Sequence, residues 1–170
     1  ADLRTRVDAY FEETGKSKND NAFMVFKTLF WGGGTIALWS LMLFGGFSPL
    51  VSWGLVALFG FFMAGVGFNI GHDAIHGAYS KKKWVNDLMS WSFDLMGASS
   101  YTWSIAHNFL HHTYTNVPEK DDDIHQPLIH LYPQPEKRTF LHKGQHVYGI
   151  LMYTLTSLNW LLKKDFKLIA

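Results

Sequence analysis

The stretch TLFWGGGTIALWSLMLFGGFSPLVSWGLVALFGFFMAGVGFNIG, residues 28–71, contains no Asp, Glu, Lys, Arg or His. One helix needs about 20 apolar residues to cross a bilayer, so this stretch is long enough for two crossings. The sequence GGFSP at 45–49 favours a turn near its middle, because Gly tolerates turn angles and Pro is well suited to the first position of a helix. We therefore predict a transmembrane hairpin over residues 22–70, with helices at about 22–44 and 49–70.

The overall composition is that of an ordinary folded protein. The 170 residues are 48% apolar with a net charge of +1, which excludes a disordered chain and gives no support for nucleic-acid binding. The mean hydropathy of -0.01 averages the hairpin with polar flanks. A hairpin buried inside a soluble protein is the alternative, but a chain of this length has too little polar mass to enclose it. Because Cys is absent, disulfides, zinc thiolates and iron–sulfur clusters are excluded for these residues.

Two further segments have helical patterns. Residues 1–20 place apolar side chains at helical spacing and predict an amphipathic N-terminal helix. Residues 147–162, VYGILMYTLTSLNWLL, predict a third hydrophobic helix. The expected fold is therefore an all-α integral membrane protein, in which a polar region at 71–146 carries cytoplasmic helices. Close helix contact in the hairpin is expected at its glycines, which are Gly32, Gly33, Gly34, Gly60, Gly65 and Gly67.

The basic residues predict the orientation in the membrane. Lys and Arg lie before the hairpin, between positions 4 and 27, and again between positions 81 and 143, whereas the turn at 45–49 has none. The positive-inside rule then places the N-terminus and the region 71–146 on the cytoplasmic side. Lys163, Lys164 and Lys167 would lie on the other side if the third helix crosses, so the sequence leaves that crossing open.

Five of the 9 histidines fall in two tight groups, His72 with His76, and His107 with His111 and His112. Residues four apart on an α-helix share a face, so each group can point two imidazoles at one place. The α-helical period turns His112 by about 100 degrees from His111, which predicts that it serves a neighbouring metal. Five imidazoles exceed the needs of one ion, and the pattern therefore predicts two metals.

The position of these groups favours iron among the candidate metals. Imidazole without thiolate suits iron, zinc, copper or nickel. A histidine cluster at the cytoplasmic end of an apolar hairpin suits chemistry on a lipid chain. The C–H bonds of an acyl chain are unactivated, and no side-chain acid or base removes their hydrogen. Oxygen activated on non-haem iron does so, and this is the kind of reaction that proteins leave to a cofactor.

At these residues the sequence resembles the integral-membrane fatty acid desaturases. The resemblance lies in GHDAIHG at 71–77, HNFLHHTYTN at 107–116 and DDDI at 121–124. The segments QHVY at 145–148 and RVDAYF at 6–11 are similar to the bacterial linoleoyl-CoA (front-end) subgroup, which acts on acyl-CoA or acyl-lipid substrates. The resemblance extends over essentially the whole chain.

The resemblance implies a di-iron centre in which His72, His76, His107, His111 and His112 are ligands, with no further catalytic residue. It implies that O2 and two electrons from an external donor, of ferredoxin or cytochrome b5 type, convert a methylene pair to a cis double bond among membrane lipids. The family's third histidine box, QxxHH or HxxHH, follows another hydrophobic pair, and no HH occurs after His112. We therefore expect 1–170 to be the N-terminal portion of a desaturase, inactive by itself.

Three alternatives remain. A hydroxylase of the same histidine-rich superfamily would share iron and topology, and a non-catalytic fragment would share the topology alone. A membrane zinc protease is disfavoured, because Asp73 stands where the HExxH motif has its Glu base.

Several polar residues outside the ligand set have open or unremarkable roles. Asp73 is equally suited to orienting an imidazole and to pairing with a lysine. For Asp121, Asp122 and Asp123 we favour a solvated acidic loop over ion pairs with the boxes. The remaining histidines are expected at the surface, and these are His125, His130, His142 and His146.

Overall fold

The computed structural model describes residues 2–121, 124, 129–130, 137–159, 162–163 and 166. Within these ranges all regular secondary structure is helical, as predicted. The chain forms two compact units, Ala1–Met96 and Gly97–Ala170. The first contains the hairpin and the first histidine group, and the second contains the other histidine group. The predicted region 71–146 is therefore divided between the two units.

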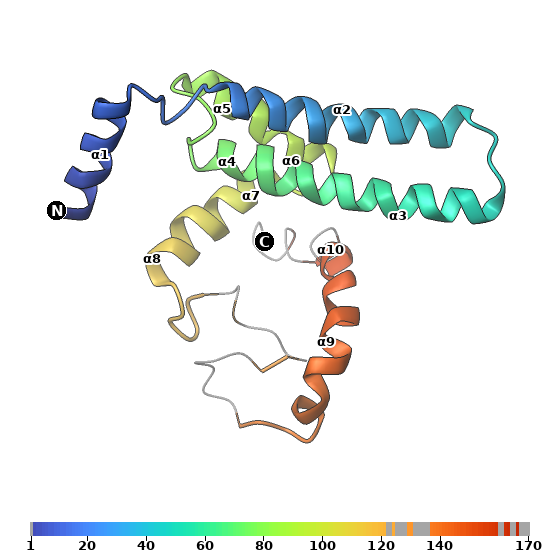
Figure 1. The fold of residues 1–170 in the computed structure, drawn as a ribbon. Coiled ribbons are helices and arrows are strands. Elements are labelled where there is room, and N and C mark those ends of the chain that lie inside the picture. The colour runs from blue at the N-terminus through green and yellow to red at the C-terminus, as the bar shows by residue number, and fades with distance from the viewer. Residues whose placement is uncertain are drawn as a thin grey trace. The chain divides into compact units, whose positions relative to one another are not determined.

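An antiparallel helical hairpin dominates the first unit (Figure 1). Helix α2 (Ala22–Phe44) and helix α3 (Pro49–Val66) run side by side, joined by a short turn in which Gly46 has a φ of 57°. The side chain of Asn21 caps α2 by accepting the N–H of Met24, and Pro49 opens α3. Among the described residues, Ala22–Phe44 and Pro49–Ile75 are the two helices whose length and composition suit a membrane crossing. The predicted hairpin is confirmed.

Glycine permits close contact between α2 and α3 at particular positions. A Cβ at Gly65 would lie 2.0 Å from the Trp31 ring, and one at Gly34 would lie 2.2 Å from the Phe62 ring. At Gly33 and Gly60, in contrast, a Cβ would meet no atom within 4 Å. Close packing therefore depends on some of the predicted glycines only.

The outer surface of the hairpin is apolar and exposed. Leu29, Phe44, Leu50 and Trp53 are between 70% and 85% exposed. Contiguous exposed apolar surface of this kind marks contact with lipid or with another protein.

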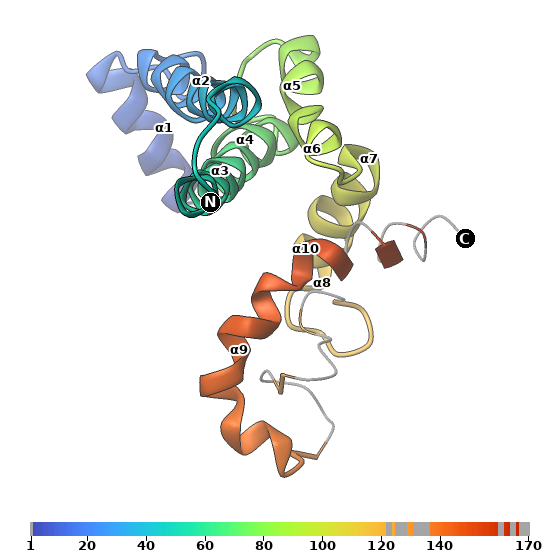
Figure 2. The same cartoon turned by 90° about the vertical axis from the view of Figure 1, so that its right-hand side faces the viewer.

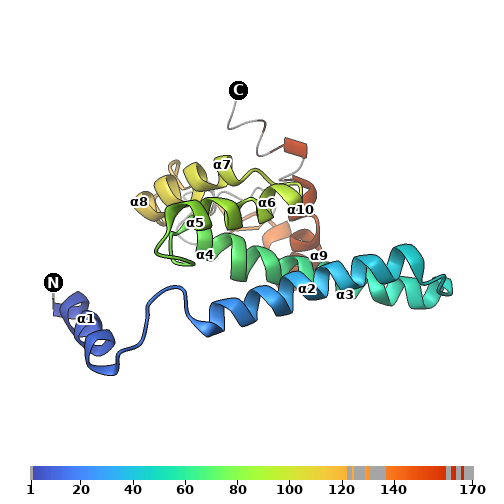
Figure 3. The same ribbon diagram turned by 90° about the horizontal axis from the view of Figure 1, so that it is seen from above.

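Helix α1 and the helices after the hairpin complete the first unit. Helix α1 (Asp2–Thr14) is shorter than the predicted helix over 1–20 and lies beyond the N-terminal end of α2 (Figure 3). Helices α5 (Lys83–Ser90) and α6 (Ser92–Leu95) lie to one side of the hairpin (Figure 2). The first unit has a small core of Val66, Ile70, Ala74 and Tyr79. Met96 and partly buried side chains of α2 and α5 pack around this core.

The second unit begins with one continuous helical segment made of three elements. Helix α7 (Ser100–Trp103), the π-helix η2 (Ser104–His111) and α8 (His112–Tyr114) follow without interruption (Figure 1). A short 3-10 helix, η3 (Leu141–Gly144), then leads into α9 (Gln145–Thr154) and α10 (Thr156–Asn159). The predicted third helix over 147–162 is thus helical but divided at Leu155, and Trp160 and Leu161 lie outside the described residues.

Candidate metal centre

The first histidine group, His72 and His76, lies at the C-terminal end of the continuous helix that starts as α3. A π-helical turn, η1 (Gly67–Gly71), continues α3 into α4 (His72–Ile75), and His76 caps α4. The Nε2 atoms of His72 and His76 are 3.3 Å apart. Imidazole nitrogen binds a metal such as zinc at about 2.0–2.1 Å, so two such bonds can span this distance. The donor type and the spacing therefore fit a single ion between these two side chains.

Glycines on either side of this group shape it. A Cβ at Gly71 would lie 2.8 Å from the Phe93 ring, so α6 can pack directly against the turn before His72. Gly77 has a φ of 67° and ends the helix just after His76. Its N–H donates to the carbonyl of Ala74, and the N–H of Ala78 donates to that of Asp73. This pair of bonds is the Schellman motif, in which glycine takes the left-handed position.

Asp73 pairs with a lysine from α2, the first helix of the hairpin. The Nζ atom of Lys27 lies 2.5 Å from its Oδ2 atom, and the two side chains are 13% and 24% exposed. The sequence left Asp73 open between two roles, and the structure shows the lysine pair. Lys27 therefore reaches toward the first histidine group from the start of α2.

The segment before α2 also holds the loop that follows His76. The side chain of Asn19 donates to the carbonyl of Ala78, and the N–H of Asp20 donates to that of Tyr79. In return, the carboxylate of Asp20 accepts the N–H of Lys81 at 2.8 Å. This bond, more than the nearby lysine charges, lowers the pKa of Asp20 from its ordinary value. The position of the first group therefore depends on residues more than 50 positions earlier.

The second histidine group lies on the π-helix. The N–H of His112 donates to the carbonyl of His107, five residues earlier. Because the hydrogen bond closes at the fifth residue rather than the fourth, positions four and five after His107 lie on either side of it. The His107 ring centroid is 5.2 Å from that of His111 and 4.8 Å from that of His112. His112 therefore lies closer to His107 than the α-helical period would place it, and its assignment to a neighbouring metal stays a prediction.

A buried carboxylate contacts this second group. Nδ1 of His111 lies 3.0 Å from Oδ1 of Asp121, whose side chain is fully buried. The solvated loop favoured from the sequence is therefore wrong for Asp121, while Asp122 and Asp123 lie outside the described residues. Trp103 stacks on His107 with ring centroids 5.2 Å apart. The sequence offered an ion pair of Asp121 with the boxes only as the less favoured alternative and did not indicate the stacking of Trp103, although a histidine ligand is expected to have such a carboxylate partner.

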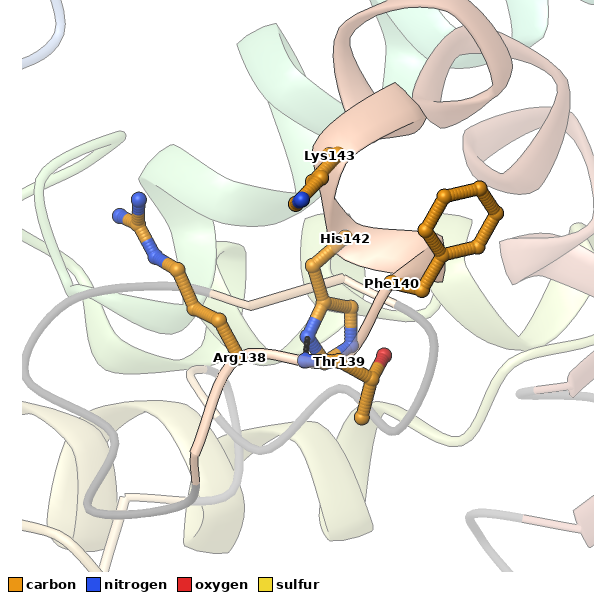
Figure 4. A pocket seen from close by; sticks show the side chains of 5 residues that line it. All are labelled: Arg138, Thr139, Phe140, His142 and Lys143. Carbon is orange, nitrogen blue, oxygen red and sulfur yellow. Dashed lines mark hydrogen bonds between the residues drawn. The ribbon is translucent and has the colours of Figure 1, made fainter.

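The other histidines differ in their surroundings. His146 is exposed on α9, and His125 lies outside the described residues. His130 stacks on His142 with centroids 5.5 Å apart. His142 also lines a hollow of about 420 Å³, together with Arg138, Thr139, Phe140 and Lys143 (Figure 4). None of the five predicted ligands is among these lining residues, so the hollow is not part of either histidine group.

Comparison with known proteins identifies the family. Residues 47–170 match the family model for fatty acid desaturases. The chain is 40% identical over 164 residues to the sn-1 linoleoyl-lipid 6-desaturase of Arthrospira platensis, covering 94% of this chain and 43% of that protein. It is 35% identical over 162 residues to the enzyme of the same name from Synechocystis sp., covering 94% and 45%. No solved structure matches.

The family match and the two helices suited to a membrane crossing define the class as an integral membrane protein. The chain belongs to the fatty acid desaturase family, whose members generally use iron and act on fatty acyl substrates. It spans less than half the length of the two cyanobacterial relatives that it matches.

Proposed function

We propose that the protein to which this chain belongs is an acyl desaturase that inserts a cis double bond into an acyl lipid or an acyl-CoA. The observation that carries this proposal is the pair of histidine groups, each with converging imidazoles, in a chain of the desaturase family. The similarity to the two linoleoyl-lipid desaturases of Arthrospira platensis and Synechocystis sp. favours the lipid-linked substrate over the CoA ester.

The proposed metal ligands are His72, His76, His107, His111 and His112, which would contribute to a di-iron centre. Iron supplies the activation of O2 that removal of hydrogen from an unactivated acyl chain requires. Overall, two hydrogens leave adjacent methylenes, and O2 takes up these with two electrons and two protons to form two waters. The electrons come from a donor protein of ferredoxin or cytochrome b5 type.

The chain's own residues position this chemistry. The hairpin presents its apolar surface to lipid, and the first histidine group directly follows the helix of its second crossing. The Lys27–Asp73 pair and the loop contacts of Asn19 and Asp20 hold that group at the end of the hairpin where α2 begins. We assign this end of the hairpin to the cytoplasmic side, because the basic residues flank it.

Product analysis tests the proposal. The full-length protein would be given an acyl lipid or the matching acyl-CoA, with O2 and a reduced ferredoxin system, and the acyl products would be analysed by mass spectrometry. The proposal predicts a product that has lost two hydrogens, which the His72→Ala variant does not form and the His146→Ala variant does. A product that has gained one oxygen would instead identify a hydroxylase.

A further inference from the structure

The carboxylate of Asp121 contacts the ring of His111 and the backbone N–H of Asn116 inside the second unit. Its oxygens lie 3.0 and 3.1 Å from Nδ1 of His111, and Oδ2 also accepts the N–H of Asn116 at 2.9 Å. A buried carboxylate is unfavourable unless donors of this kind surround it. The contact is therefore a specific arrangement rather than a chance approach at the surface.

A tight turn brings Asp121 back to His111 from ten residues further along the chain. The N–H of Val117 donates to the carbonyl of Tyr114, and the N–H of Asp121 donates to that of Val117. Asn116 has a φ of 61°, a left-handed conformation that Asn adopts more readily than most residues. The segment HTYTNVPEK, residues 112–120, thus forms a defined connection between the two residues.

The contact determines which nitrogen of His111 carries the proton. A neutral imidazole has one N–H and one lone pair, whereas a carboxylate only accepts hydrogen bonds. The proton therefore lies on Nδ1, and the lone pair lies on Nε2. We propose that Asp121 is a positioning residue, which fixes His111 in this tautomer and orients its ring so that Nε2 is the metal-binding atom.

Nε2 is also the converging atom in the first histidine group. There, the two atoms that converge are the Nε2 atoms of His72 and His76. The inference rests on the proposed function to the extent that His111 is a metal ligand. Beyond that function, it assigns Nε2 as the metal-binding atom of His111 and Asp121 as the residue that selects this atom.

Removing the charge of Asp121 without changing its shape tests the inference. In the full-length protein, Asp121→Asn retains the side-chain volume, but its amide can donate to Nδ1 and so move the lone pair away from Nε2. We expect iron affinity, measured by competition with a chelator, to fall about 10- to 100-fold, the usual effect of losing such a partner. A role in packing alone predicts iron affinity near that of the wild type, and this result would overturn the inference.

Two comparisons show whether Asp121 acts through His111. In a His111→Ala background, Asp121→Asn should cause no further loss of iron affinity, whereas an additive loss would contradict the proposal. The matched control is Asp87→Asn, which removes a half-exposed carboxylate paired with Lys83 and should leave iron affinity unchanged.

Nitrogen NMR of the metal-free wild-type protein gives a reading that needs no stable Asp121 variant. With 15N-labelled histidine, and His111→Ala for assignment, Nδ1 of His111 should give the signal of a protonated ring nitrogen. A proton on Nε2 would overturn the inference. Because none of these readouts is product formation, failure of the desaturase proposal would be recognised separately, as an iron-binding protein that yields a different product.

Discussion

At the scale of single residues, the Lys27–Asp73 pair connects the first crossing of the hairpin to the first histidine group. Both side chains are more than three-quarters buried, and Asp73 lies directly beside His72. The pair joins positions 46 residues apart. It therefore fixes the register of α2 against the helix that carries the proposed ligands.

Loss of Lys27 should be more costly than loss of an exposed lysine. Lys27→Met leaves the Asp73 carboxylate without its cation, and we expect a loss of about 1–3 kcal/mol in the free energy of unfolding. The control Lys83→Met removes an exposed pair with Asp87 and should cost about 0–1 kcal/mol. Denaturant unfolding in detergent measures both, and equal losses would show that the buried pair has no special role. Adding Asp73→Asn to Lys27→Met should restore part of the loss.

The proposed ligands come from the sequence, whereas their supporting residues emerge only in the structure. Spacing alone singles out His72 and His76, because helical periodicity relates residues four apart. No periodicity relates His111 to Asp121, since a turn with left-handed residues lies between them. The partner of Asp73 could not be assigned for a similar reason, because it depends on the packing of α2 against α3.

At the scale of secondary-structure elements, the sequence correctly predicted the hairpin but not the π-helices. A long run of uncharged residues indicates membrane-spanning helices by its length and composition alone, so predicting the hairpin requires no detailed geometry. The π-helical turns at Gly67–Gly71 and Ser104–His111 change which residues share a face, and the second turn brings His112 beside His107 for this reason. Such turns are frequent at functional sites, and here each one precedes or contains a histidine group.

Helix packing in the hairpin gives a prediction that compares a glycine in close contact with one that faces open space. Gly65→Ala places a Cβ against the Trp31 ring, so we expect a loss of about 1–3 kcal/mol in stability from overpacking. Gly33→Ala meets open space and should be neutral, or slightly stabilising through its higher helix propensity. Thermal unfolding of the two variants measures the difference. Equal midpoints would contradict the close packing of α2 against α3.

At the scale of the whole molecule, the hairpin places the start of α2 and the first histidine group at one end, with the turn at 45–48 at the other. The chain contains no Cys, so introduced cysteines report single positions in it. We expect Ser17→Cys and Lys82→Cys to react with a membrane-impermeant thiol reagent only from the cytoplasmic side, and Ser48→Cys only from the opposite side. Labelling of all three from one side would refute a membrane-spanning hairpin.

We propose that the two histidine groups of this chain hold iron in the full-length protein. The most direct test of this claim is the metal content of that protein, purified as wild type and as the variants His76→Ala, His111→Ala and His146→Ala, and measured by elemental mass spectrometry. We predict about two irons per wild-type chain, a clear loss of iron in the first two variants, and wild-type iron in His146→Ala, whose histidine lies outside both groups. Zinc in place of iron, or undiminished iron in His76→Ala and His111→Ala, would contradict the claim.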